Sequence, residues 1–251
     1  KSLGNTVDLI KLVNQYGADI VRLWATSVAY QQDVRISDEI MKQISENYRK
    51  IRNTMRFVLG NLNDFKQSDL VAVNDLTDVD KYMLVELNNL IDGYHQAYDN
   101  YDFADANQQI LNYFTNVLSS FYMDFTKDIL YIEKADSLRR RQVQTVLYYH
   151  AKAMMKLISP VLVFTAEELH DHFHCDENKA ESIFLEPNVE KVVIENSDEI
   201  KSYFDRFLLL RKDVLKVLET LRNDKVIKSN MEAKVFISLK DEFKDMAKLA
   251  D

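Results

Sequence analysis

Glycine and proline are scarce in this chain, and their scarcity constrains the fold more than any other feature of the sequence. The 251 residues include only 4 glycines and 2 prolines. These two residue types mark most tight turns and element ends, so a chain with so few of them has few turns for its length. Long helices are therefore favoured over many short strands.

The helical pattern is clearest between Gly17 and Phe65, where two helices joined by a short polar link are predicted. Asp19 is expected to cap the first helix and Ser37 the second, and Gly60 is expected to end the second. Apolar residues recur along the second helix in steps of three or four, which keeps one face towards a core. They are Ile40, Ile44, Tyr48, Ile51, Met55 and Leu59.

The same periodicity predicts further helices over residues 78–98, 103–132, 137–158 and 198–222. Asn5 or Thr6 is expected to cap a short first helix that Gly17 closes, and Pro160 is expected to restart a helix as its first residue. Four long amphipathic helices with short connections predict an antiparallel bundle. The fold class is therefore mainly α.

The C-terminal part has a different pattern. Ile183–Leu185 is short and apolar enough for an extended piece, and Ala233–Leu239 alternates and is rich in β-branched residues, as a strand is. We interpret the second stretch as the start of a small, truncated α/β unit at the C-terminal junction.

Charge is distributed unevenly along the chain. The net charge of −8 argues against a protein that coats nucleic acid indiscriminately. Acidic residues dominate from Asp69 to Asp105, whereas basic residues dominate from Arg206 to Lys228. Such segregation can orient a polyanion on one face, but two ordinary solvated helix faces explain it equally well.

The remaining composition limits the class of protein. No apolar run approaches the roughly 20 residues that span a bilayer, and no secretory signal is present. The single Cys175 excludes an internal disulfide framework and indicates a reducing cytoplasm. The run His170, His172, His174, Cys175 does not have a standard zinc spacing, so no metal site is predicted.

Several segments of the chain resemble the bacterial isoleucyl-tRNA synthetases, in the order that these enzymes have them. They are KSLGN, GADIVRLW, DVRISDEI, YRKIRNTMRFVLGNLNDF, DILY, TVLYYH and FTAEEL. The valyl and leucyl enzymes share the architecture, and DVRIS with YRKIRNT favours the isoleucine enzyme. The segment 228–233 departs from the family's pattern, which makes the C-terminal junction less certain.

The resemblance implies that this chain is the anticodon-binding, C-terminal portion of a longer, monomeric, cytoplasmic enzyme. The complete enzyme ligates isoleucine to its tRNA with ATP and Mg, and its catalytic and editing domains are expected upstream. KSLGN matches the end of the KMSKS signature, so Lys1 and Ser2 are expected near ATP. The family's zinc, where present, is bound beyond Asp251. The chain itself is expected to be non-catalytic, without cofactor or metal.

On this resemblance the chain divides into four parts. Residues 1–36 form the KMSKS tail and the helices that contact the tRNA stem, and residues 37–175 form the anticodon-binding helical bundle. Residues 176–197 are a linker, and residues 198–251 form the C-terminal junction helix and the start of the small α/β unit.

The candidates for tRNA contact are basic residues. They are Arg35, Lys42, Arg49, Lys50, Arg52 and Arg56, with Arg211 and Arg222 from the later basic helix. Arginine suits bidentate contacts with phosphates and stacking on unpaired bases. Arg35 lies in the link between two helices and is favoured for RNA contact, whereas a solvated helix face explains the others equally well. Trp24 is expected in the core.

Two alternatives to this function stay open. The chain can be the anticodon-binding domain of a valyl-type synthetase. It can also be a helical interaction module whose acidic segment, from Asp69 to Asp105, binds a protein partner. Contacts with several phosphates make affinity fall with salt, and this dependence separates an RNA-binding domain from the second alternative.

Overall fold

The computed structural model describes residues 7–31, 33–240 and 243–246 of the chain. These residues form helices and connecting loops, without a β-strand among them. They divide into two compact units, Lys1–Ile194 and Glu195–Asp251. Within the described residues, no helix is both long and apolar enough to cross a membrane.

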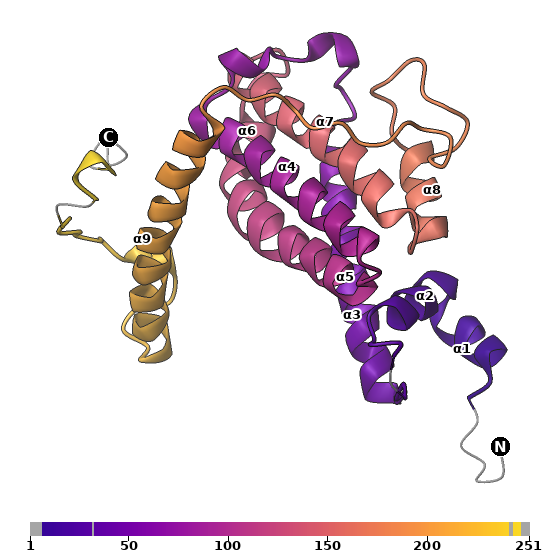
Figure 1. Cartoon of the computed structure of the whole chain (residues 1–251). Coiled ribbons are helices and arrows are strands. Elements are labelled where there is room, and N and C mark those ends of the chain that lie inside the picture. The colour runs from indigo at the N-terminus through magenta and orange to yellow at the C-terminus, as the bar shows by residue number, and fades with distance from the viewer. Residues whose placement is uncertain (1–6, 32, 241–242, 247–251) are drawn as a thin grey trace. The chain divides into compact units, whose positions relative to one another are not determined.

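The first unit is a bundle of long helices preceded by two short ones (Figure 1). Its helices are α1 Leu9–Tyr16, α2 Ala18–Thr26, α3 Asp38–Gly60, α4 Asp78–Asp99, α5 Phe103–Asn112, α6 Asp124–Ile132, α7 Leu138–Ile158 and α8 Val163–Asp171. The 3-10 turns η1 Gln67–Asp69 and η2 Val73–Asp75 connect α3 to α4. Helix α4 packs on both α5 and α7, and α3 packs on α2 and α7. The predicted helical bundle is therefore confirmed.

Helix α7 forms the centre of this bundle. Residues 142–148 are all buried, and most of its later residues up to Ile158 are buried as well. A helix that is buried on all sides must have neighbours on all sides, and α7 contacts α3, α4, α6 and α8. Each large apolar side chain buried there contributes about 1.5–3 kcal/mol to folding.

The predicted helix over residues 103–132 is continuous, but its centre is wound more widely than an α-helix. Helix α5 runs through the π-helical segment η3, Tyr113–Met123, into α6. Hydrogen bonds in a π-helix span five residues, and Ser120 Oγ donates to the Thr115 carbonyl at 2.6 Å with that spacing. The segment turns Phe114, Phe121 and Tyr122 into the core.

Some of the predicted helix caps are confirmed and others are not. Ser37 accepts a hydrogen bond from the Ile40 amide and starts α3, as predicted. Asp8 caps α1; the predicted caps Asn5 and Thr6 lie outside the described residues. Gly17 closes α1 with a φ of 92°, a conformation that favours glycine. Pro160 does not start a helix, because it lies in a turn and α8 begins at Val163.

The core face of α3 is rotated slightly from its predicted position. Ile51 and Met55 are fully buried as expected, but the other predicted apolar positions are half-buried. Met41 and Val58, which the periodicity did not assign to the core, are fully buried instead. Trp24, predicted in the core, is half-buried.

The second unit contains the long helix α9, Ser197–Asn223, and the short 3-10 turn η4, Asn230–Glu232. Helix α9 agrees with the prediction, but the strand over 233–239 does not form. A strand requires a partner for its backbone hydrogen bonds, and the described residues supply none; Phe236 in this stretch is 83% exposed. The predicted extended piece at 183–185 is also wrong, because these residues form a turn closed by Leu185 and Ser182.

Candidate functional site

An exposed basic stripe runs along α3. It consists of Lys42, Arg49 and Arg56, which follow one another at intervals of seven residues. Seven residues are nearly two helical turns, so the three side chains lie on one side of the helix at intervals of about 10.5 Å. Lys50, also exposed, lies beside the stripe.

The cations of the stripe and the neighbouring Lys50 are largely uncommitted. Arg49 pairs with Glu46 at 2.5 Å, and both side chains are more than half exposed. The side chains of Lys42, Lys50 and Arg56 form no hydrogen bond or ion pair with any described residue. An exposed ion pair such as Arg49–Glu46 is weak, so all four cations are available to an anionic partner.

Arg35 lies in the link between α2 and α3, and the described residues of this link are not helical. Its side chain is exposed and has no polar partner within the described part of the chain. The link precedes the start of α3, where the helix dipole and the unpaired amides favour negative charge. The acidic residues Asp38 and Glu39 occupy that first turn.

Arg52 differs from the stripe because it is already paired within the bundle. Its guanidinium donates to both oxygens of Glu168 on α8, each at 2.6 Å, and its side chain is 33% exposed. The hydrogen bond from Arg52 holds the pKa of Glu168 below its ordinary value, against a smaller opposing effect of burial. A phosphate contact by Arg52, as predicted from the sequence, would have to replace this pair.

Arg52 belongs to a polar seam that joins α2, α3 and α8. Its members are Asp19, Tyr48, Arg52, Thr165 and Glu168. Tyr48 and Thr165 share a hydrogen bond of 2.9 Å between their hydroxyls. The Asp19 carboxylate, 7% exposed, accepts from the Thr165 hydroxyl at 2.6 Å and from the Thr165 amide at 2.7 Å.

The role of Asp19 corrects a prediction. We expected it to cap its own helix, but Gly17 is the N-cap of α2 and forms no side-chain cap there. Asp19 instead accepts from the Phe164 and Thr165 amides, at 3.3 and 2.7 Å, in the first turn of α8. The residue before α8 is Leu162, which has no side-chain acceptor, so the cap comes from a distant helix.

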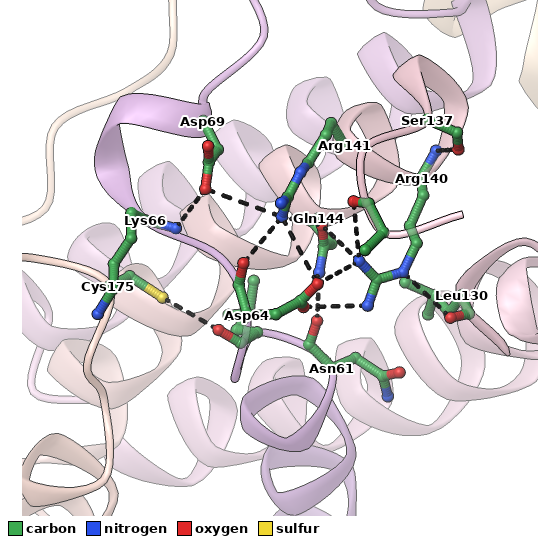
Figure 2. A network of polar contacts seen from close by, with 12 residues as sticks. Asn61, Asp64, Lys66, Asp69, Leu130, Ser137, Arg140, Arg141, Gln144 and Cys175 are labelled. Carbon is green, nitrogen blue, oxygen red and sulfur yellow. Dashed lines mark hydrogen bonds and ion pairs between the residues drawn. The ribbon is translucent and has the colours of Figure 1, made fainter. Parts of the chain in front are cut away.

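A second polar network holds the C-terminal end of α3 against α7 (Figure 2). The Arg140 guanidinium donates to both oxygens of Asp64, at 2.5 and 3.0 Å, and Arg141 donates to the Asp64 carbonyl at 3.0 Å. Gln144 donates to the Asn61 carbonyl and to Asp64, both at 2.8 Å. The hydrogen bonds from Arg140 hold the pKa of Asp64 below its ordinary value. These basic residues are therefore structural.

The acidic segment from Asp69 to Asp105 does not form one uniform exposed face. Asp80 is fully buried, accepts from the Tyr122 hydroxyl at 2.7 Å and pairs with Arg139. Asp69 accepts from the Lys66 amide at 2.9 Å, and Asp92 pairs with Lys191 at 2.9 Å. Three acidic residues of this segment, Asp69, Asp80 and Asp92, are therefore engaged by partners within the bundle.

The remaining predicted residues lie elsewhere. Arg211 and Arg222 are on α9 in the second unit, where Arg211 is half-buried and Arg222 is exposed near the end of the helix. Lys1 and Ser2 lie outside the described residues. Within the described part of the chain, no group of three or more His, Cys, Asp or Glu side chains is placed to hold a metal ion. Burial raises the pKa of the Cys175 thiol to about 11.

Comparisons with known proteins agree with this architecture. The profile of the family described as "Anticodon-binding domain of tRNA ligase" matches residues 80–237. The isoleucine–tRNA ligase of Bacillus subtilis (strain 168) is 50% identical over 247 residues, which are 98% of this chain and 27% of that protein. That of Geobacillus kaustophilus (strain HTA426) is 49% identical over 243 residues, 96% of this chain and 26% of that protein.

The chain thus spans about a quarter of the length of these relatives. Among solved structures, the ternary complex of Agrobacterium radiobacter K84 agnB2 LeuRS with tRNA and LeuAMS is similar, with a TM-score of 0.54 and 17% identity. The match covers 80% of this chain and 22% of that chain. At this identity the likeness shows the fold alone.

Proposed function

The chain belongs to the family of anticodon-binding domains of tRNA ligases, and from this premise we propose that it holds the anticodon stem and loop of an isoleucine tRNA. The observation that carries the proposal is the basic stripe of α3. Its cations are exposed at regular intervals on a chain whose net charge is −8, so a polyanion has a defined place to bind.

The bundle contributes rigidity to this role. Helix α3 is 23 residues long, about 34 Å, and both of its ends are held by polar contacts. The backbone of the stripe is therefore already ordered before RNA binds, so only the side chains lose conformational entropy on binding. Phosphate contacts position the RNA, and contacts with unpaired bases provide its identity.

Within this proposal, Arg35 makes the strongest single contact. Its side chain extends from a link whose two ends are fixed by α2 and α3, and no described residue competes for it. Arg35→Ala should weaken tRNA binding more than the loss of Lys42 or Lys50 does. Equal losses for the three variants would contradict this ranking.

For the whole protein we propose the activity that its relatives' names state, the ligation of isoleucine to its tRNA. ATP with Mg would activate the amino acid and so drive that reaction. Lys1 and Ser2, as the end of a KMSKS signature, would then lie near the triphosphate, and Arg211 and Arg222 would add to the tRNA-binding surface. The protein is proposed to act as a cytoplasmic monomer, with this chain as its non-catalytic tRNA-binding portion.

The proposal is tested by the binding of this chain to purified isoleucine tRNA, with valine tRNA as competitor, at two salt concentrations. We expect affinity to fall steeply with salt, because each phosphate contact releases counterions, and we expect isoleucine tRNA to be preferred. Preference for valine tRNA would favour a valyl-type synthetase. A folded chain that binds neither tRNA would refute the proposal and favour a protein partner.

A further inference from the structure

A cavity of about 370 Å³ lies in the first unit, beside α7 and the end of α8. Its floor is formed by buried side chains, among them Tyr148, His170 and Phe173, and its rim includes the exposed residues Asn188 and Glu190. The volume is within the range of small-ligand sites, and the combination of aromatic walls with a few polar groups is typical of them. The basic stripe contributes no residue to this cavity.

The floor of the cavity contains a polar group that the protein does not satisfy. His170 is 2% exposed, and its Nε2 lies 3.2 Å from Glu186 Oε1. Its Nδ1 is buried and has no hydrogen-bond partner among the described residues. Buried polar atoms are almost always paired, because an unpaired one costs free energy. Because Nδ1 is enclosed by protein, a ligand in the cavity does not reach it, and the polar group beside His170 that a ligand can meet is the carboxylate of Glu186.

The uncommitted oxygens around the cavity are acceptors. Glu186 Oε1 accepts from His170 and from the Ala180 amide, at 3.2 and 2.8 Å, while its Oε2 has no partner within the described part of the chain. Burial opposes ionisation of Glu186, but these hydrogen bonds outweigh it and hold the pKa of its carboxyl below the ordinary value. The carboxylate of Glu190 on the rim is likewise unpaired.

The cations around the cavity are already engaged. Lys152 pairs with Asp176 at 2.7 Å. Lys156 donates to the backbone carbonyls of Ile183 and Glu186, at 3.1 and 2.7 Å. With its lysines occupied and its carboxylates partly free, the cavity disfavours a phosphate and favours an uncharged group that donates hydrogen bonds.

An aromatic surface completes the cavity. Tyr149 is half-buried, and its ring stands at 82° to that of Tyr148, with the centroids 5.6 Å apart. We propose that this cavity binds one unpaired nucleobase with an exocyclic amino group, which is adenine, cytosine or guanine, stacked on an aromatic side chain and donating to Glu186 or Glu190. Carboxylates accept from the amino groups of bases, and unpaired bases stack on aromatic rings. The inference rests on the proposed tRNA-binding function.

The test is a cycle of paired changes in protein and RNA. The RNA is an isoleucine tRNA anticodon stem-loop in which each unpaired position is replaced, one at a time, by an abasic nucleotide. The protein variants are Tyr149→Ala and Glu186→Gln, with Tyr131→Ala as the control, because Tyr131 is 67% exposed and does not line the cavity. Affinities are measured by equilibrium titration, and circular dichroism verifies that each variant is folded.

We expect one abasic position to lower the affinity of the unchanged chain by about tenfold, the size of one base–aromatic stack. Tyr149→Ala and Glu186→Gln should each lose a similar factor, and that abasic position should cause no further loss in either variant. In Tyr131→Ala the abasic loss should remain complete.

Independent losses at every position, or full affinity in both cavity variants, would overturn the cavity proposal and leave the proposed function standing. An unchanged chain that binds none of these RNAs would overturn both. If Glu186→Gln does not fold, Tyr149→Ala decides alone.

Discussion

The basic stripe and the polar seam lie side by side on α3 and use the same kind of side chain differently. Arg49 and Arg56 of the stripe are exposed, whereas Arg52 of the seam pairs with Glu168 on α8. Three residues turn a helical side chain by about 60°, because the helix has 3.6 residues per turn. That rotation separates an arginine available to RNA from one that holds two helices together.

The comparison shows that the type and spacing of cations do not define a binding surface by themselves. What matters is whether another element brings an acceptor within reach. Helix α8 brings Glu168 to Arg52, but no described acceptor reaches Lys42 or Arg56. The four predictions below compare the stability of buried polar groups with the RNA affinity of exposed cations.

The largest expected effect is on stability, from loss of the buried carboxylate of the seam. Asp19→Ala would leave the Phe164 and Thr165 amides and the Thr165 hydroxyl without their acceptor. We expect the free energy of unfolding to fall by about 4 kcal/mol. Urea denaturation followed by fluorescence of Trp24, the one tryptophan, measures it.

Asp8→Ala is the matched control, because Asp8 caps α1 at an exposed site and its loss should cost about 1 kcal/mol. If both substitutions lower the free energy of unfolding equally, the Asp19 contacts of the seam stabilise the fold no more than an ordinary helix cap does.

Another buried polar group, His150, should make stability depend on pH. Its Nδ1 lies 2.7 Å from the Val146 carbonyl and its Nε2 lies 2.8 Å from the Tyr113 hydroxyl, an arrangement that suits the neutral ring. Burial lowers the pKa of His150 from 6.5 to about 4. Between these values the unfolded chain binds a proton that the folded chain does not, so stability decreases as the pH is lowered from 6.5 to 4, by about 3 kcal/mol in total.

The measurement is the free energy of unfolding at intervals from pH 7 to about pH 3, below the ordinary pKa of a carboxyl group. His150→Gln should flatten the part of the curve between pH 6.5 and 4, and leave the later loss from the carboxylates Asp64 and Glu168 in place. A variant with the same slope as the unchanged chain would show that another group binds the proton.

Removal of the basic stripe should affect RNA binding and leave stability nearly unchanged. Lys42→Ala, Arg49→Ala and Arg56→Ala combined should lower tRNA affinity by roughly 30-fold, about 2 kcal/mol, and reduce the slope of log K against log salt by about 2. Titrations at three salt concentrations measure both quantities. If the triple variant keeps the salt slope of the unchanged chain, the RNA binds to another surface.

The smallest effect is expected for Arg52→Lys. Lysine keeps the charge but cannot reproduce the bidentate pair with Glu168. The partly exposed pair should lose about 1 kcal/mol of stability, with little change in tRNA affinity. Arg49→Lys is the control, and we expect it to change neither quantity measurably. A loss of tRNA affinity in Arg52→Lys, without a loss in Arg49→Lys, would show that Arg52 contacts the RNA.

Local features of the sequence were enough to predict most of the helices. Apolar periodicity placed α4, α7 and α9 within a residue or two, and Ser37 and Ser137 start their helices as capping residues should. These features work because helix hydrogen bonds and caps involve residues close in the chain. The sequence placed Lys42, Arg49, Arg52 and Arg56 on this helix, but it did not separate the exposed cations from Arg52, which is paired with Glu168.

Contacts between distant residues decided the rest. Asp19 caps a helix that begins 144 residues later, and Arg52 pairs with a residue 116 positions away. The stretch 233–239 has the pattern of a strand but lacks a described partner, and the cavity combines α7 with loops that have no periodicity. A single stretch of sequence carries its own propensity, but the partner that satisfies a buried charge or a strand edge is supplied only by the folded chain.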